Sequence, residues 1–143
     1  MHIAIVVATH GASAAPMCNS AQMLAGQQQN FAAVDFMPGE NVESLVTKLR
    51  QTLQSLDIQN GVLFLVDIFA GSPFNAASLL SAEHEDWDVI SGVNIPMLVN
   101  IFIERETINS FTSLAELAKE TGADGVKRMK TDLIIPTSAM EEL

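Results

Sequence analysis

The sequence has little cysteine, few basic residues and no long apolar run. Its single cysteine, Cys18, excludes an internal disulfide and favours a reducing cytoplasm. Only seven Lys and Arg occur in 143 residues, and the net charge is −10, which argues against a nucleic-acid or anionic-membrane surface. No apolar run approaches the roughly 18 residues that span a bilayer, and the N-terminus lacks the features of a signal peptide. These absences predict a cytoplasmic protein.

Several common site motifs are also missing. The chain has no Walker loop, no G-x-G-x-x-G and no acidic cluster of the phospho-receiver type after its first apolar run. Residues Gly11–Ala15 come near the G-x-S-x-G nucleophile elbow, but they lack its second glycine, and the chain is short for a hydrolase of that kind. No second His or Cys accompanies His84. We expect neither a metal nor a cofactor.

What the sequence does have is a succession of short apolar runs separated by helix-like segments. Residues Ile3–Ala8, Phe31–Phe36, Val62–Asp67 and Trp87–Ser91 read as strands. Helical spacing or capping residues predict helices over roughly 13–26, 41–56, 73–84 and 110–121. The apolar stretch Ile95–Phe102 is ambiguous by periodicity, and Pro96 near its start favours a helix. Residues 129–135 read as a last, exposed strand. We expect a single domain over residues 1–135 and a loose tail over 136–143.

This alternation predicts an α/β fold: a doubly wound sheet of four parallel strands with helices on both faces. In the flavodoxin-like strand order 2-1-3-4, the first and third strands are neighbours, and ligands bind at the switch point beside them. His10 follows the first apolar run and Asp67 ends the third. The topology therefore predicts that His10 and Asp67 lie side by side.

A carboxylate beside a histidine can fix its tautomer and leave the other ring nitrogen free as a nucleophile. Gly71, Ser72 and Pro73 predict a helix start with Ser72 as N-cap, where free N–H groups can bind an anion. Together these groups suit phosphoryl transfer through a phosphohistidine. Each residue also has a purely structural interpretation, because strand ends often carry histidine, and Asp67 and Ser72 can simply cap helices. Their convergence favours function.

The chain resembles the IIA subunit of the mannose class of the bacterial phosphoenolpyruvate-dependent sugar phosphotransferase system. The resemblance rests on motifs spread over about residues 1–130 in the family's order: Thr9-His10-Gly11 after the first strand, residues 35–41 (DFMPGEN), Gly61–Asp67, residues 71–75 (GSPFN) and residues 92–98 (GVNIPML). Several such motifs in the right order make the signal specific.

The resemblance implies that His10 is phosphorylated by the phosphocarrier protein HPr and passes the group to a IIB partner. That partner phosphorylates sugar entering through a membrane IIC/IID complex, with which the cytoplasmic subunit associates peripherally. Asp67 would orient His10, and Ser72 and Gly71, with Thr9 and Gly11 flanking the histidine, would hold the phosphoryl group. The family forms homodimers in which a C-terminal antiparallel strand, here about residues 131–135, crosses to the partner's sheet.

One position departs from the family pattern, because Ala70 stands where relatives often have the first of two glycines. A positive φ there would strain the loop. Two alternatives within the fold stay open: a phosphorylated regulatory domain, and the phosphocarrier subunit of a dihydroxyacetone kinase. A flavodoxin-like binding protein is a third, although residues 11–14 supply only one hydroxyl for a phosphate loop.

Overall fold

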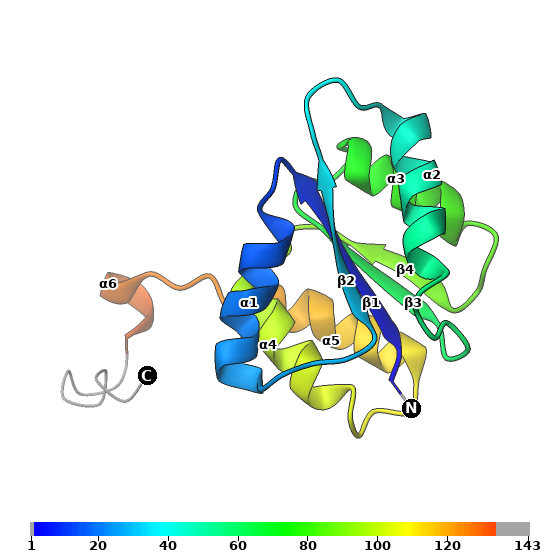
Figure 1. Cartoon of the computed structure of the whole chain (residues 1–143). Coiled ribbons are helices and arrows are strands. Elements are labelled where there is room, and N and C mark those ends of the chain that lie inside the picture. The colour runs from blue at the N-terminus through cyan, green and yellow to red at the C-terminus, as the bar shows by residue number, and fades with distance from the viewer. Residues whose placement is uncertain (1, 134–143) are drawn as a thin grey trace.

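The computed structural model describes residues 2–133, which form a four-stranded parallel sheet covered by helices on both faces (Figure 1). The strands lie in the order β2-β1-β3-β4, which confirms the predicted sheet. Their bounds are β1 Ala4–His10, β2 Phe31–Phe36, β3 Val62–Val66 and β4 Trp87–Ile90. The helices are α1 Ala14–Ala25, α2 Val42–Leu53, α3 Ser72–Ser81, α4 Ile95–Glu104, α5 Phe111–Asp124 and α6 Met129–Asp132.

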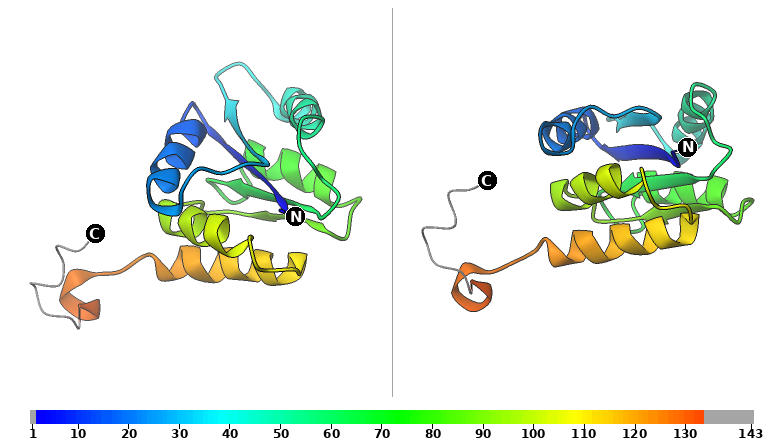
Figure 2. Two further views of the ribbon diagram at one scale, coloured as in Figure 1. Left: turned by 60° about the horizontal axis from the view of Figure 1, so that its bottom comes forward. Right: turned by 90° about the horizontal axis from the view of Figure 1, so that it is seen from below.

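Side-chain alternation along β1 divides the core into two layers. Ile5 and Val7 pack with the helices α1, α4 and α5, whereas Val6 and Ala8 pack with α2 and α3 on the other face (Figure 2). Because both faces of the strand are covered, β1 is buried and apolar from Ala4 to Ala8, as is typical of a parallel strand. The ambiguous segment after Asn94 is the helix α4, in agreement with the expectation from Pro96.

The C-terminal part of the described chain differs from the prediction. Residues 129–135 were expected to form a strand, but Met129–Asp132 is one helical turn, α6, which lies away from the α/β body (Figure 1). Its N–H groups bond locally, with Asp132 N–H donating to the Arg128 carbonyl at 2.8 Å. A strand forms its backbone hydrogen bonds with a neighbouring strand. A segment without such a neighbour satisfies its N–H and C=O groups within itself, as this helical turn does. Residues 134 and 135, and the predicted tail, lie outside the described residues.

The sheet's geometry brings two chain segments to one edge. In the β1–β3 register Ala8 lies opposite Val66, so His10 and Asp67 leave the sheet at the same end. The turn after β2 reaches this end too, since His10 pairs in register with Phe36. Within residues 2–133, no helix is long and apolar enough to cross a bilayer.

Candidate active site

His10 and Asp67 are in direct contact at the carboxyl end of the sheet. The His10 backbone N–H donates to Asp67 Oδ2 at 2.9 Å, and the ring Nδ1 lies 3.0 Å from Oδ2 and 3.1 Å from Oδ1. Asp67 Oδ1 also accepts from the Ile68 N–H at 2.9 Å. The predicted neighbourhood of His10 and Asp67 is confirmed.

The contact fixes which nitrogen of His10 is free. An ionised carboxylate only accepts hydrogen bonds, so Nδ1 carries the proton, and in the neutral ring Nε2 keeps its electron pair. Burial raises the pKa of Asp67, but the hydrogen bonds from the backbone and ring of His10 lower it more, and the net shift is downward. Asp67 therefore stays ionised at neutral pH. The His10 side chain is 42% exposed, which leaves the ring open to a partner.

The segment from Ile68 to Ser72 brings the start of α3 against the His10 ring. A Cβ on Gly71 would lie 3.0 Å from His10 Cε1 and 3.6 Å from Nε2, so glycine permits this close approach. The helix begins one residue earlier than predicted: Gly71 is the N-cap, and its carbonyl accepts the first helical bond, from Asn75 N–H at 2.9 Å. The prediction of Ser72 as N-cap is thus wrong, and Ser72 is the first helical residue.

Because α3 begins at Ser72, directly after Gly71, hydrogen-bond donors of its first turn come close to the His10 ring. The N–H groups of Ser72 and Phe74 belong to the first helical turn and have no carbonyl of their own helix to bond, while Pro73 has no N–H. Among the described residues the Ser72 hydroxyl makes no side-chain hydrogen bond, and the Ser72 side chain is half-buried. A helix N-terminus attracts an anion with about 0.3–1 kcal/mol from its dipole. These donors follow directly after Gly71, which lies against the His10 ring.

Thr9 and Gly11 have other contacts in this structure. The buried Thr9 hydroxyl lies 2.8 Å from Ser13 Oγ, which in turn donates to the His10 carbonyl at 3.3 Å. The Gly11 N–H donates to the Phe36 carbonyl at 2.8 Å. Ser13 occupies the N-cap position of α1 without a side-chain cap bond. In this structure the Thr9 hydroxyl and the Gly11 N–H therefore hold the backbone around His10 in place.

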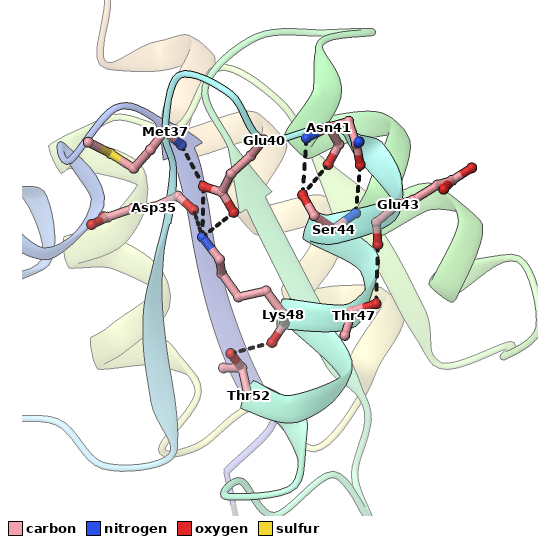
Figure 3. Close-up of polar contacts among 9 residues, drawn as sticks. All are labelled: Asp35, Met37, Glu40, Asn41, Glu43, Ser44, Thr47, Lys48 and Thr52. Atoms are coloured by element: carbon pink, nitrogen blue, oxygen red, sulfur yellow. Dashed lines mark hydrogen bonds and ion pairs between the residues drawn. The ribbon is translucent and has the colours of Figure 1, made fainter.

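The turn between β2 and α2 forms another wall of the site. The Phe36 ring meets the His10 ring edge-on, with centroids 5.6 Å apart. Beyond it, Lys48 Nζ donates to the Asp35 carbonyl at 2.7 Å and pairs with Glu40 at 2.7 Å, while Glu40 Oε2 accepts from the Met37 N–H at 2.7 Å (Figure 3). Hydrogen bonds from Lys48 and Met37 lower the pKa of Glu40.

The sequence did not single out Lys48 or the pairing of Glu40. At the end of this turn Asn41 forms a capping box with Ser44 at the start of α2 (Figure 3). Lys48 lies on α2, 13 residues from Asp35, and no local pattern ties a lysine at that distance to the turn. It holds the turn through a long side chain.

Other chemically active side chains lie apart from this site. Burial raises the pKa of the Cys18 thiol to about 11, so Cys18 is a packed, protonated residue. The His84 ring stacks on Trp87 with centroids 3.8 Å apart, and His2 pairs with Glu106 at 2.9 Å. Within the described chain no three His, Cys, Asp or Glu side chains gather in a metal-binding arrangement.

Comparison with known proteins agrees with this geometry. Residues 4–119 match the EIIA-man family, described as "PTS system fructose IIA component", where PTS denotes the phosphotransferase system. The chain is 51% identical over 130 residues to the "PTS system mannose-specific EIIAB component" of Escherichia coli K12, covering 91% of this chain and 40% of that protein. The chain thus spans well under half the length of that relative.

Shorter relatives match over most of their length. The "PTS system fructose-specific EIIA component" of Bacillus subtilis is 31% identical over 135 residues, which is 90% of this chain and 92% of the relative. The crystal structure of phosphotransferase system component EIIA from Streptococcus agalactiae superimposes with a TM-score of 0.80 at 25% identity, covering 90% of this chain and 98% of that one. The chain therefore belongs to the EIIA-man family.

Proposed function

We propose that His10 accepts a phosphoryl group at Nε2 from phosphorylated HPr and passes it to a IIB partner. The contact between the His10 ring and the Asp67 carboxylate carries this proposal, because it presents Nε2 as a free nucleophile. Family membership supports the same chemistry. The relatives are named for mannose and fructose, which favours sugar transport over a regulatory domain or a dihydroxyacetone kinase subunit.

The transfer itself conserves atoms and charge. The Nε2 electron pair of His10 forms the new P–N bond while the P–N bond of the donor phosphohistidine breaks, and its electron pair returns to the donor imidazole. Asp67 stabilises the positive charge that develops on the His10 ring. The phosphoryl oxygens would lie against the N–H groups of Ser72 and Phe74 and the Ser72 hydroxyl, where the helix dipole favours negative charge. The second transfer, to IIB, reverses these bond changes.

An exposed apolar rim around His10 supports docking of both carriers. Ile68 is 56% exposed, Phe69 72% and Met37 43%, so large apolar side chains flank the half-exposed histidine. Exposed apolar side chains grouped in this way are typical of interaction surfaces. Through the IIB partner the protein would also associate with a membrane IIC/IID complex. We therefore expect it in the cytoplasm, at the periphery of that complex.

The test is phosphorylation with purified carriers. The protein is incubated with phosphoenolpyruvate, enzyme I and HPr, and its intact mass is followed. We expect an acid-labile gain of one phosphate in the wild type and none in His10→Ala. His84→Ala is the matched control, because His84 is exposed and stacks on Trp87 away from the site, so this variant should take up phosphate normally. Uptake by His10→Ala, or none by the wild type with active carriers, would refute the proposal.

We also propose that two copies associate along β4. Among the described strands β4 pairs only with β3, and a cavity of about 630 Å³ lies along its other side, lined in part by Asp88, Ile90, Lys119 and Val126. Val126 and Met129 are 77% and 60% exposed, so the segment after α5 carries apolar surface without cover among the described residues. An exposed strand edge is a template for another strand, and residues after 128 of a second copy would extend to pair with it.

Sedimentation of the full chain tests this association. We expect about twice the monomer mass of 15.4 kDa at micromolar concentration. A chain ending at residue 128 should sediment as a monomer, with the sheet intact by circular dichroism. A monomeric full chain would overturn the dimer and leave the phosphoryl transfer proposal standing.

A further inference from the structure

The loop before α3 contains a backbone conformation that its sequence does not favour. Ala70 has φ of +63°, in the left-handed region. It is the third residue of a turn closed by the Gly71 N–H, which donates to the Ile68 carbonyl at 3.2 Å. Turns with positive φ at this position usually have glycine or asparagine there. An alanine side chain disfavours the conformation, so neighbouring contacts must stabilise it.

The left-handed turn determines where α3 begins relative to His10. It directs Gly71 against the His10 ring, where a Gly71 Cβ would lie 3.0 Å from Cε1. The Ser72 and Phe74 N–H groups follow directly. If Ala70 relaxed to negative φ, the Ala70–Gly71 peptide would rotate, and the first turn of α3 would move away from Nε2. The conformation of one exposed alanine thus controls the distance between the nucleophile and the donors.

Asn75 is the side chain that holds this conformation. Its Nδ2 donates to the Ala70 carbonyl at 3.2 Å, and its own backbone N–H donates to the Gly71 carbonyl at 2.9 Å. One residue of the first turn of α3 therefore bonds the carbonyls of two successive residues, Ala70 and Gly71. Phe69 and Phe74 form a second link between loop and helix, with ring centroids 4.8 Å apart.

We propose that Asn75 is a positioning residue for phosphoryl transfer, whose side-chain amide keeps Ala70 in the left-handed conformation and so keeps the α3 donors beside His10 Nε2. Asn75 acts through the loop and touches neither the ring nor the phosphoryl group. The expected effect of Asn75 on the rate of phosphoryl transfer rests on the function proposed above. Its geometric part, the link from Asn75 to the Gly71–His10 contact, holds independently of any phosphoryl donor.

The experiment compares four proteins: wild type, Asn75→Ala, the double variant Asn75→Ala with Ala70→Gly, and Asn100→Ala. The last is the matched control, since Asn100 Nδ2 also bonds a backbone carbonyl, that of Pro96 at 2.8 Å, but on α4. The single-turnover rate of uptake from phosphorylated HPr is measured for each. We expect the uptake rate of Asn75→Ala to be about tenfold lower than that of the wild type, the effect of one lost hydrogen bond. The uptake rate of Asn100→Ala should match that of the wild type.

The double variant separates positioning from direct contact. Glycine adopts positive φ without penalty, so Ala70→Gly should return the uptake rate of Asn75→Ala to within about twofold of the wild type. If Asn75 instead contacted HPr or the phosphoryl group, glycine at position 70 would not restore the rate. Unchanged uptake in Asn75→Ala, or a loss that Ala70→Gly leaves uncorrected, would overturn the proposal.

A second measurement keeps the geometric part testable whatever the uptake result. In proton NMR a nuclear Overhauser effect should join a Gly71 Hα to His10 Hε1, because the Gly71 Cβ direction faces Cε1. We expect this signal in the wild type and the double variant, and its loss in Asn75→Ala. If the wild type accepts no phosphate, the proposed function fails while this signal still decides the role of Asn75. A signal that persists in Asn75→Ala contradicts that role.

Discussion

Asp67 holds His10 at two points, through the backbone N–H and through the ring. Oδ2 is 2.9 Å from the His10 backbone nitrogen and 3.0 Å from Nδ1. Because the same oxygen contacts both groups, the orientation of the ring is tied to the end of β1 as well as to the carboxylate. The Phe36 ring meets the His10 ring edge-on, and Gly71 lies against its Cε1. The imidazole is held by contacts from the end of β2 and from the β3–α3 loop while Nε2 stays free.

Asp67→Asn should slow phosphoryl uptake more than it affects the fold. An amide keeps one acceptor oxygen, but its NH₂ group can donate to Nδ1, which moves the ring proton to Nε2 and blocks the nucleophile. Loss of a charge-assisted hydrogen bond predicts a rate about 10- to 100-fold lower. The rate is obtained by quenching uptake from phosphorylated HPr at successive times and measuring the intact mass of the protein. A variant as fast as the wild type would show that Asp67 does not set the tautomer.

The same carboxylate should make stability depend on pH in the acid range. Burial opposes ionisation, but the His10 hydrogen bonds outweigh it and lower the pKa of Asp67 below its ordinary value of 3.8. The unfolded chain therefore binds the proton first, and the stabilisation is present above pH 3.8 and lost as pH falls through the lower folded pKa. Urea unfolding from about pH 5 to 2 should show a shallower pH dependence in Asp67→Asn. An unchanged slope would contradict the assignment.

Much of the sheet and the core of the site could be predicted from the sequence, because both follow from local patterns and topology. The apolar character of Phe31–Phe36 predicted a strand with the observed bounds, and parallel strand order predicted that His10 lies beside Asp67. Ser72 was misassigned as the cap because proline is tolerated at either of the first helical positions, and here Pro73 is the second. Residues 129–132 form a helical turn in the single chain where a strand was predicted, because a strand depends on its neighbour.

The contacts of long side chains could not be predicted either, since they join positions far apart in the sequence. Lys48 and Arg105 appear in no local pattern that names their acceptors. Buried Arg105 bonds the carbonyl of Ile3, 102 residues away, at 2.9 Å. Such contacts become visible only when the elements are placed in space. They explain how the ends of β1 and β2 are held together, which periodicity alone does not address.

Lys48→Met should loosen the turn beside His10. Without Nζ the Asp35 carbonyl and the Glu40 carboxylate lose their shared partner, and Glu40 is then less firmly held beneath the Met37 N–H (Figure 3). Amide hydrogen exchange of Met37 should accelerate by about tenfold or more. Lys127→Met is the control, because among residues 2–133 the only ion pair of Lys127 is the exposed one with Asp124. Equal Met37 protection in both variants would show that Lys48 does not hold the turn.

Arg105→Met should destabilise the protein without impairing the site. The Arg105 guanidinium donates to the carbonyls of Ile3, Gln29 and Asn30 and to the Gln28 side chain. Burial lowers the pKa of Arg105 to about 10, so the group remains charged at neutral pH. Leaving these acceptors without a donor predicts a loss of about 2–4 kcal/mol.

Urea unfolding measures the cost of Arg105→Met, with exposed Arg50→Met as the control that should stay within about 0.5 kcal/mol of the wild type. Ile3 and His10 lie at opposite ends of the first strand region, so the folded fraction of Arg105→Met should take up phosphate at the wild-type rate. A cost below about 1 kcal/mol would mean that water replaces the guanidinium.

Ala70→Gly should stabilise the protein, although substitutions to glycine usually destabilise a folded protein. Alanine at φ of +63° carries strain of about 1–2 kcal/mol, whereas glycine costs about 0.5–1 kcal/mol through the entropy of the unfolded chain. The difference predicts a gain of about 0.5–1 kcal/mol in the free energy of unfolding. Ala15→Gly, on the exposed side of α1, should lose about 1 kcal/mol. Opposite signs for the two substitutions follow only if Ala70 is strained in solution, and a loss in Ala70→Gly would show that the loop there has relaxed.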